Sequence, residues 1–172
     1  MESITHTLPA LIQQLHKLQF ESSDGAGIEF EPFEDFLSAK DTQDWWRAWT
    51  GNADADASKY LVFGQDGTGG YAAIWLIRES NDLLAQPIVF FGSEGELAVI
   101  SQNFSDYLWL LAGGHGPYEA AADLSDEKTP DTKFSEFAKQ HATTSRSKPS
   151  EIVTRARTEF PDFEKDIISL CK

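Results

Sequence analysis

The chain has 172 residues, of which 41% are hydrophobic and 12% aromatic, a composition typical of one folded domain and not of a disordered protein. At this length about 70% of the surface of the unfolded chain is buried on folding, so no disulfide or metal is needed for stability. The formal net charge of −14 argues against a nucleic-acid binder and against binding to an anionic membrane surface, because both need a basic footprint.

Three features favour a cytoplasmic protein. The single cysteine, Cys171, excludes an intramolecular disulfide framework, which suits a reducing compartment. The N-terminal stretch "MESITHTLPALIQQLHKLQF" has no basic start and no long apolar run, so we expect no signal peptide. No window approaches the length of apolar sequence that a membrane span needs, so we expect no membrane segment.

The first elements in the chain are a helix, an edge strand and a second helix. Apolar residues at helical spacing from Leu8 to Leu18 predict an amphipathic helix with Thr7 as its N-cap. The segment "GIEFEPF" alternates apolar and acidic residues and predicts a short edge strand that ends at Pro32. The segment "DWWRAWTG" predicts a short helix that ends before Gly51.

Strand-like runs rich in β-branched and aromatic residues come next, separated by Gly, Asn, Asp and Ser. The second run is apolar on both faces, so we expect this strand to be central and covered on both sides. The segment "FFGSEGELAVI" predicts a hairpin with its tip at residues 92–95. The runs are Lys59–Phe63, Tyr71–Arg78, Pro87–Phe91 and Glu96–Ser101.

Helices dominate the remainder of the sequence. Asn103 is placed to cap a helix, with Asp106 in the capping-box position and Gly113 at the end. The polar tail from residue 117 to 172 predicts two more helices, the second broken at Pro161. The sequence therefore predicts a single domain over residues 1–172 with an α+β fold: one mainly antiparallel sheet flanked by N-terminal and C-terminal helices.

The glycines between the first two strand runs raise the question of a nucleotide site. Residues 67–72 fit the dinucleotide pattern G-x-G-x-x-G/A, which holds a pyrophosphate when a helix follows. Here the following residues, "AAIWLIRE", predict a strand, and no Gly-Lys-Ser/Thr ending marks a Walker A loop. We therefore expect a hairpin turn and no cofactor.

One loop has the residue spacing of a calcium site but lacks two residues that such a site requires. Asn52, Asp54 and Asp56 imitate the first three ligands of a calcium loop, but Ala57 takes the place of the required Gly and Phe63 that of the bidentate Glu. We expect a solvated loop at these positions.

Histidine and nucleophile patterns give no catalytic site. His115 and Glu119 are spaced as two ligands on one helical face, yet "GGHGP" cannot be helical and no third ligand is near in sequence. No G-x-S-x-G motif occurs, and nothing pairs two carboxylates as acid and base. We therefore expect no metal site, no catalytic residue and no enzyme.

The order of elements resembles a known family. A strand, "YLVFGQDGTGGYAAIWL", is followed by "QPIVFFGSEGELAVISQNFSDYLWLL": strand, Gly-Gly, strand, Pro-led strand, acidic hairpin, strand, and a helix with Phe-Ser-x-Tyr-Leu. This order resembles the SUKH superfamily, which contains Smi/Knr-type cell-wall-assembly regulators of fungi and many bacterial immunity proteins. The resemblance covers about residues 60–113, and the helical C-terminal extension of residues 117–172 lies outside it.

The resemblance implies a non-enzymatic protein-binding domain, in bacteria an immunity protein that binds and neutralises a cognate toxin, often a nuclease. A −14 protein is suited to such a partner, because a nuclease domain is basic where it holds phosphates. Solubility alone is the other explanation of this charge. Two further functions stay open: a hydrolase or small-ligand enzyme with a cleft beside residues 67–70, and a regulatory scaffold without a toxin partner. The oligomeric state is also open.

Five carboxylates are candidates for a partner-binding surface. Asp66 lies in the glycine loop, and Glu94 and Glu96 lie on the hairpin tip. Asp54 and Asp56 precede the first of the four strand runs and should lie at its opposite end, so the five cannot form one small patch. We favour the end with Asp66, Glu94 and Glu96, because turns between neighbouring antiparallel strands gather there.

Trp46 has two interpretations. It is either a core residue or, beside the acidic "DADAD" loop, an exposed aromatic anchor for a partner. Trp45 and Trp49 share one helical face, and Trp46 points elsewhere.

Overall fold

The computed structural model describes residues 6–20, 28–122, 124 and 130–172. Its centre is a five-stranded antiparallel sheet in the order β1-β2-β3-β4-β5, so each strand pairs with its neighbour in sequence. The expected α+β fold with one antiparallel sheet is confirmed. The strands are β1 (Phe30–Pro32), β2 (Tyr60–Asp66), β3 (Tyr71–Trp75), β4 (Ile88–Phe91) and β5 (Leu97–Ser101).

Helices precede, interrupt and follow the sheet. They are α1 (Ala10–His16), α2 (Ala39–Thr50), α3 (Phe104–Ala112), α4 (Pro117–Ala122), α5 (Thr132–His141), α6 (Pro149–Glu159) and α7 (Phe163–Leu170), with a short 3-10 helix, η1 (Leu83–Ala85), between β3 and β4.

Strand β3 is the central strand, as its sequence predicts. Ala72 and Ile74 belong to the hydrophobic cluster on one face of the sheet, whereas Tyr71, Ala73 and Trp75 pack against the cluster on the other. An alternating side-chain period with apolar residues on both faces requires cover on both faces, and the helices provide it.

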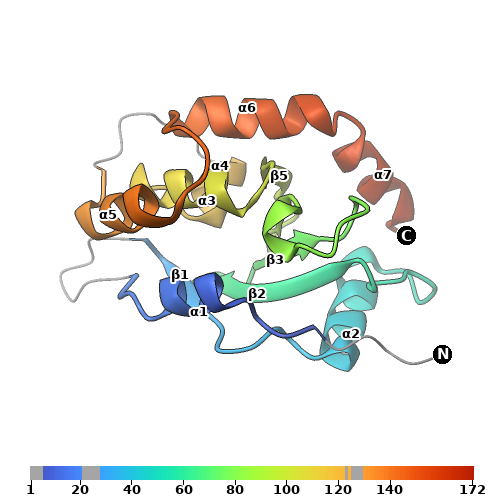
Figure 1. The fold of residues 1–172 in the computed structure, drawn as a ribbon. Coiled ribbons are helices and arrows are strands. Elements are labelled where there is room, and N and C mark those ends of the chain that lie inside the picture. Colours follow the sequence, from blue (N-terminus) through green and yellow to red (C-terminus); the bar gives the residue numbers. More distant parts are fainter. Residues whose placement is uncertain (1–5, 21–27, 123, 125–129) are drawn as a thin grey trace.

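The helices divide between the two faces. Residues of α1, α3, α4 and α5 bury their apolar sides in the first cluster, and residues of α2 and α7 bury theirs in the second. Helix α6 contributes to both clusters, and in Figure 1 it passes along the top of the molecule and turns down into α7. The bend between α6 and α7 contains Pro161, where the sequence predicts a break.

The ends of the strands differ somewhat from expectation. β2 continues through Asp66, because β1 pairs with this part of it and Phe30 lies opposite Asp66. β3 stops at Trp75, and the backbone N–H groups of Ile77 and Arg78 donate to the side-chain oxygen of Gln86 at 3.2 and 2.9 Å. A side chain therefore replaces the neighbouring strand as hydrogen-bond partner at that point.

Two of the expected caps are present. The side chain of Asn103 accepts a hydrogen bond from the backbone N–H of Asp106 at 2.8 Å, and Gly51 ends α2 with a positive φ of 64°. Thr7, however, does not cap α1, because the helix begins at Ala10 after Pro9. Helix α2 also begins earlier than its tryptophans suggest.

The early start of α2 has a capping signal in the sequence. The side chain of Ser38 accepts a hydrogen bond from the backbone N–H of Asp41 at 3.0 Å, the arrangement typical of a helix N-terminus.

Candidate partner-binding surface

The two acidic turns lie side by side at one end of the sheet. The turn of residues 66–70 joins β2 to β3, and the turn of residues 92–96 joins β4 to β5. A Cβ atom placed on Gly70 would lie 3.0 Å from the Cα atom of Gly92, so the turns are in close contact. The glycine loop is thus a hairpin turn, as expected, and β3 follows it where a nucleotide site needs a helix.

Asp66 holds its own turn together. It is only 6% exposed, and its carboxylate accepts hydrogen bonds from the hydroxyl of Thr68 at 2.9 Å and from the backbone N–H of Gly70 at 2.6 Å. The Asp66 carboxylate is therefore engaged in hydrogen bonds within its own turn. The expectation that Asp66 presents a free charge to a partner is therefore wrong, because the turn itself needs that charge as a hydrogen-bond acceptor.

The hairpin tip presents one free carboxylate and one that is folded back. The side chain of Glu96 is half-buried, and its Oε2 atom accepts a hydrogen bond from the backbone N–H of Glu94 at 3.3 Å. A Cβ atom at Gly92 would overlap the carboxyl group of Glu96, so a glycine is needed below it. Glu94 itself is exposed.

Asp54 and Asp56 lie away from the two turns. Both are exposed in the loop before β2, whereas the turns are at the far end of β2. Asp56 accepts hydrogen bonds from the backbone and side chain of Ser58 at 3.1 and 2.7 Å, and the side-chain oxygen of Asn52 accepts one from the backbone N–H of Asp54 at 3.0 Å. These are turn-stabilising contacts, and Asp54 and Asp56 cannot share a small patch with Glu94.

Trp46 belongs to the core. Its side chain is fully buried and lies 4.9 Å from the ring of Tyr60, 5.0 Å from that of Phe91 and 5.8 Å from that of Trp49, measured between ring centroids. The alternative in which Trp46 is an exposed partner anchor is therefore wrong. The physical reason is that α2 packs on the sheet through Trp46, which occupies the space above Phe91.

Trp49 takes the place that was considered for Trp46. It is half-buried, and its indole N–H donates to the carbonyl oxygen of Gly92 at 2.8 Å, which ties α2 to the hairpin tip. It also forms part of the wall of a groove of about 600 Å³, which we call the α2–α7 groove. The groove is lined by Ala48, Trp49, Ser93, Gly95, Leu97, Glu164, Ile168 and Cys171.

The lining of the α2–α7 groove combines apolar side chains with one carboxylate. Ile168 is 63% exposed, the highest value among the large hydrophobic side chains of the described residues. Glu164 is the charged residue in the lining, and Glu94 stands between the lining residues Ser93 and Gly95. The groove therefore contains one aromatic residue, Trp49, and one carboxylate, Glu164, in its lining.

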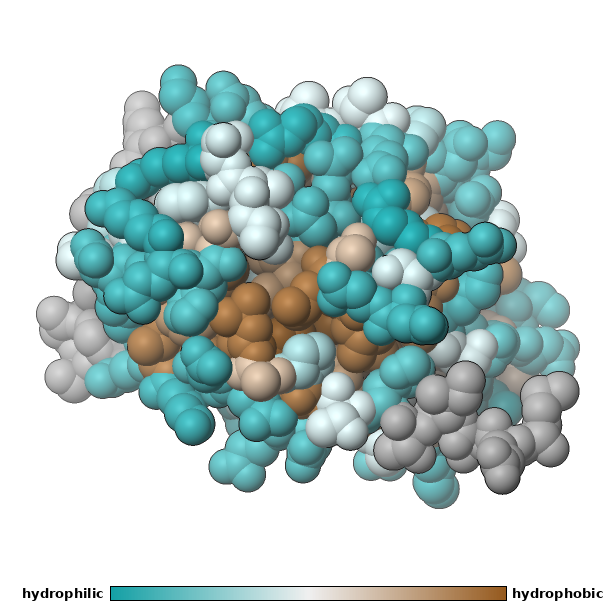
Figure 2. Space-filling model, viewed as in Figure 1, coloured by the Kyte–Doolittle hydropathy of each residue, from teal (hydrophilic) through white to brown (hydrophobic). Residues whose placement is uncertain are grey.

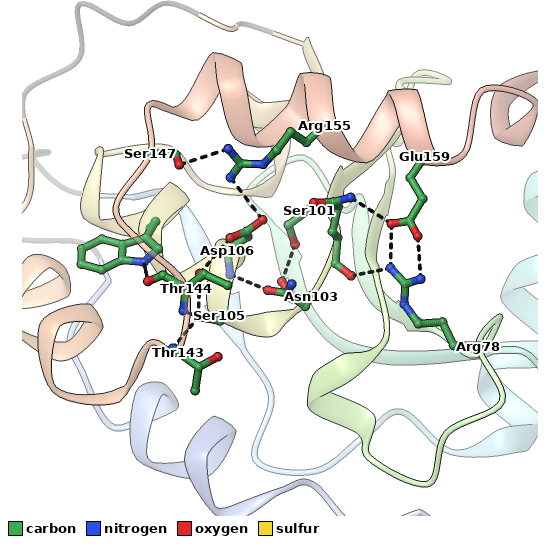
Figure 3. A network of polar contacts seen from close by, with 12 residues as sticks. Arg78, Ser101, Asn103, Ser105, Asp106, Thr143, Thr144, Ser147, Arg155 and Glu159 are labelled. Carbon is green, nitrogen blue, oxygen red and sulfur yellow. Dashed lines mark hydrogen bonds and ion pairs between the residues drawn. The ribbon is translucent and has the colours of Figure 1, made fainter.

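A second polar region stabilises the fold. Figure 3 shows Arg78 making two hydrogen bonds to Glu159 at 2.6 and 2.7 Å, so the segment after β3 is fixed to the end of α6. The Arg78 guanidinium lowers the pKa of Glu159 through these bonds.

Asp106 forms the other half of this network. Its side chain is 3% exposed and accepts a hydrogen bond from the hydroxyl of Thr144 at 2.9 Å and another from Arg155 at 3.4 Å (Figure 3). Asp106 thus bonds to the α5–α6 connection and to α6 in place of completing the capping box. Charged groups that satisfy one another in this way are typical of a structural link.

An apolar hollow opens on the face seen in Figure 2. Hydrophobic atoms lie at its centre and hydrophilic side chains surround them. The hollow has a volume of about 460 Å³ and receives residues from α1, η1, the start of α3 and the end of α5. Its apolar lining includes Leu11, Leu84 and Phe104, and its polar rim includes Asn103 and His141.

The space beside the glycine turn does not suit a phosphate. This hollow, of about 500 Å³, is lined by Glu29, Glu31 and Asp66 among others, and no Lys or Arg lines it. Carboxylates repel a phosphate group, so this hollow has the wrong charge for a nucleotide.

His115 and Glu119 do not form a metal site in the described structure. His115 is buried before the start of α4, and its Nδ1 atom lies 3.1 Å from the carbonyl oxygen of Gly113. Across the described residues, no group of three or more His, Cys, Asp or Glu side chains is arranged to hold a metal ion.

Comparisons with protein-family models, with curated proteins and with solved structures find no match to this chain. The resemblance to the SUKH superfamily therefore rests on the order of the sequence elements alone. Within the described part of the chain, no helix has both the length and the apolar character that crossing a bilayer requires.

Sequence reasoning missed the groove because its walls are distant in the chain. Trp49, Leu97 and Ile168 line one groove only after α7 packs back on the sheet beside α2. A local signal exists for Ile168 alone: Phe163 and Ile167 form the buried side of α7, and Ile168 adds an apolar residue outside that side.

Proposed function

We propose that this protein is a non-enzymatic binding domain for a basic protein partner, and that it acts as an immunity protein that covers and blocks a toxin domain. The observation that carries this proposal is the α2–α7 groove, whose lining combines Trp49, Leu97 and Ile168 with a carboxylate, on a protein of net charge −14. The family resemblance supports the toxin as partner.

The arrangement matches what a protein–protein interface needs. Desolvated apolar and aromatic contacts at the centre supply affinity, and charges at the rim steer the partner and speed association. Trp49 and Leu97 provide the apolar contacts, and Glu94 and Glu164 provide the rim charge. A cationic partner surface, such as a phosphate-binding face of a nuclease, complements this charge.

A second function is favoured by the hollow in Figure 2. A concave site with an apolar floor and a few polar groups is typical of small-ligand binding, and the hollow lined by Leu84, Phe104, Asn103 and His141 has this character. Binding of a small apolar ligand there is compatible with a partner at the α2–α7 groove.

The proposed function is tested by comparative affinity capture. The wild-type protein and the Glu94→Lys/Glu164→Lys variant are each used as bait, with Asp54→Lys/Asp56→Lys as the control of equal charge change at the other end of β2. We expect a basic protein that the wild type and the control retain and that the groove variant loses, and we expect wild-type protein to inhibit that partner's activity. Equal capture by all three baits, or turnover of a substrate by the purified protein, would contradict the proposal.

Calorimetry with ATP and with NAD tests the nucleotide alternative. No binding is expected, because β3 follows the glycine turn and carboxylates surround the hollow beside it. Micromolar binding of either nucleotide would contradict this expectation and would favour the enzyme interpretation.

A further inference from the structure

The α2–α7 groove has a fixed shape. The indole of Trp49 is bonded to Gly92 on one side, and the side-chain amide of Asn52 donates to the carbonyl oxygen of Leu170 at 2.9 Å on the other. The backbone N–H of Lys172 also donates to the carbonyl oxygen of Thr50 at 2.9 Å. The end of α7 is thus held against the end of α2, and a preformed groove binds a partner at a low cost in ordering.

Ile168 is an exposed apolar residue that lies outside the buried side of α7. In α7 the residues that bury themselves are Phe163 and Ile167, whereas Ile168 is 63% exposed. A single exposed apolar residue is common on protein surfaces. Ile168, however, lines a groove whose lining also includes Leu97 and Trp49, so it is one of three large apolar side chains around the same space.

The charge beside this apolar surface has one sign in the lining. Glu164 lies one helical turn before Ile168, and Glu94 is exposed on the hairpin tip between the lining residues Ser93 and Gly95. Three cations, Arg47, Lys165 and Lys172, also adjoin lining residues in the sequence. Like Glu94, none of them lines the groove itself, so Glu164 is the charged residue of the lining.

We infer that the α2–α7 groove is the slot for one apolar side chain of the partner, and that this side chain is flanked in the partner's sequence by Lys or Arg residues that pair with Glu164 and Glu94. This inference rests on the proposed function and specifies its binding mode. The apolar side chain packs between Trp49, Leu97 and Ile168, and the flanking cations stay at the rim, where they add speed of association more than affinity.

The probes are three short synthetic peptides. The first has a central Leu between Lys and Arg residues, the second has Gly in place of that Leu, and the third has the Leu between Glu residues. Each is titrated into isotopically labelled full-length protein and followed by amide and indole NMR signals. We expect the first peptide to shift the signals of Trp49, Gly95 and Ile168 and to bind about tenfold more tightly than the second, as partial burial of one Leu side chain implies.

Matched variants test whether the groove is responsible for the preference for the Leu peptide. Ile168→Ser should remove the tenfold preference for the Leu peptide, whereas Ile77→Ser, at 39% exposure and outside the groove lining, should keep it. Both positions are exposed, so both variants should fold, which circular dichroism checks.

The outcomes distinguish two failures. If both basic peptides bind the wild type equally, and Glu94→Lys/Glu164→Lys weakens both, the slot is wrong and the acidic binding surface stands. If neither basic peptide binds better than the acidic one, both the slot and the proposed function are contradicted. Signal changes confined to residues outside the groove would also overturn the slot.

Discussion

The indole N–H of Trp49 donates a hydrogen bond of 2.8 Å to the carbonyl oxygen of Gly92, so a helix and a hairpin tip 43 residues apart in sequence are joined by one contact. The contact fixes the turn that carries Glu94 against the helix that forms one wall of the α2–α7 groove. Local sequence contains no sign of this pairing, yet the shape of the groove depends on it.

Replacing Trp49 with Phe should loosen the hairpin tip. The ring remains but its hydrogen bond is lost, so the free energy of unfolding should fall by about 1 kcal/mol. Exchange of the Gly95 amide hydrogen, which is bonded to the same Gly92 carbonyl at 3.2 Å, should become faster. Urea denaturation and hydrogen exchange measure the two effects.

Trp45→Phe is the matched control for Trp49, because no indole hydrogen bond is found for Trp45 among the described residues. An equal change in exchange of the Gly95 amide hydrogen for both variants would contradict the role of the Trp49–Gly92 bond.

Replacing Trp46 with Ala should destabilise the fold by about 3–5 kcal/mol, because a fully buried large side chain leaves a cavity when it is truncated. Trp46→Phe should cost less. The indole nitrogen of Trp46 has no hydrogen-bond partner, so the Phe variant loses volume but no hydrogen bond. Thermal unfolding followed by circular dichroism measures both. If the Trp46→Ala variant is as stable as the wild type, the core position of Trp46 is contradicted.

His16 should make the protein less stable in mild acid. Burial lowers the pKa of His16 below its ordinary value, although a hydrogen bond to the carbonyl oxygen of Phe33 at 2.7 Å opposes this. Since a carbonyl only accepts, Nδ1 carries the proton of the neutral ring, and protonation would place a second N–H on the buried Nε2 atom, which has no partner.

The sign of the pH dependence follows from that lowered pKa. The unfolded chain binds a proton near the ordinary imidazole pKa of about 6.5, before the folded protein does. The stability that neutral His16 contributes is therefore complete above that pH and is lost as the pH falls toward the folded pKa. His16→Gln keeps a donor and should flatten the unfolding free energy in this range, as urea titrations at several pH values would show. An unchanged slope would contradict this role.

Tyr107 and Asp106 are adjacent buried polar residues with opposite expected effects. The hydroxyl of Tyr107 has no partner, and burial, with the nearby Glu119 charge, raises its pKa. Tyr107→Phe should therefore be neutral or stabilising. Asp106→Ala removes the carboxylate that accepts hydrogen bonds from Thr144 and Arg155, and should cost about 2 kcal/mol. Chemical denaturation of the two variants tests the contrast, which a clear loss of stability in Tyr107→Phe would contradict.

Much of the sheet can be predicted from the sequence because its signals are local. Apolar residues on both faces of Tyr71–Trp75 identify the central strand, and the glycines at 69 and 95, with φ of 94° and 93°, mark turns that other residues adopt with strain.

The candidate site is less predictable because it depends on tertiary contacts. Helical spacing separates Trp46 from Trp45 and Trp49, but only the packing on Phe91 determines which of them is buried. Likewise the charge of Asp66 is visible in the sequence, whereas its use within the turn is visible only in the folded chain.

The most direct test of the central claim is the association rate of the captured basic partner, measured at low and at physiological salt for the wild type, for Glu94→Lys/Glu164→Lys and for Asp54→Lys/Asp56→Lys. If the carboxylates of Glu94 and Glu164 steer the partner, the first variant should associate several-fold more slowly than the second at low salt, and the difference should shrink as salt screens the charges. Equal association rates for the two variants at low salt would contradict the claim that this groove is the partner-binding surface.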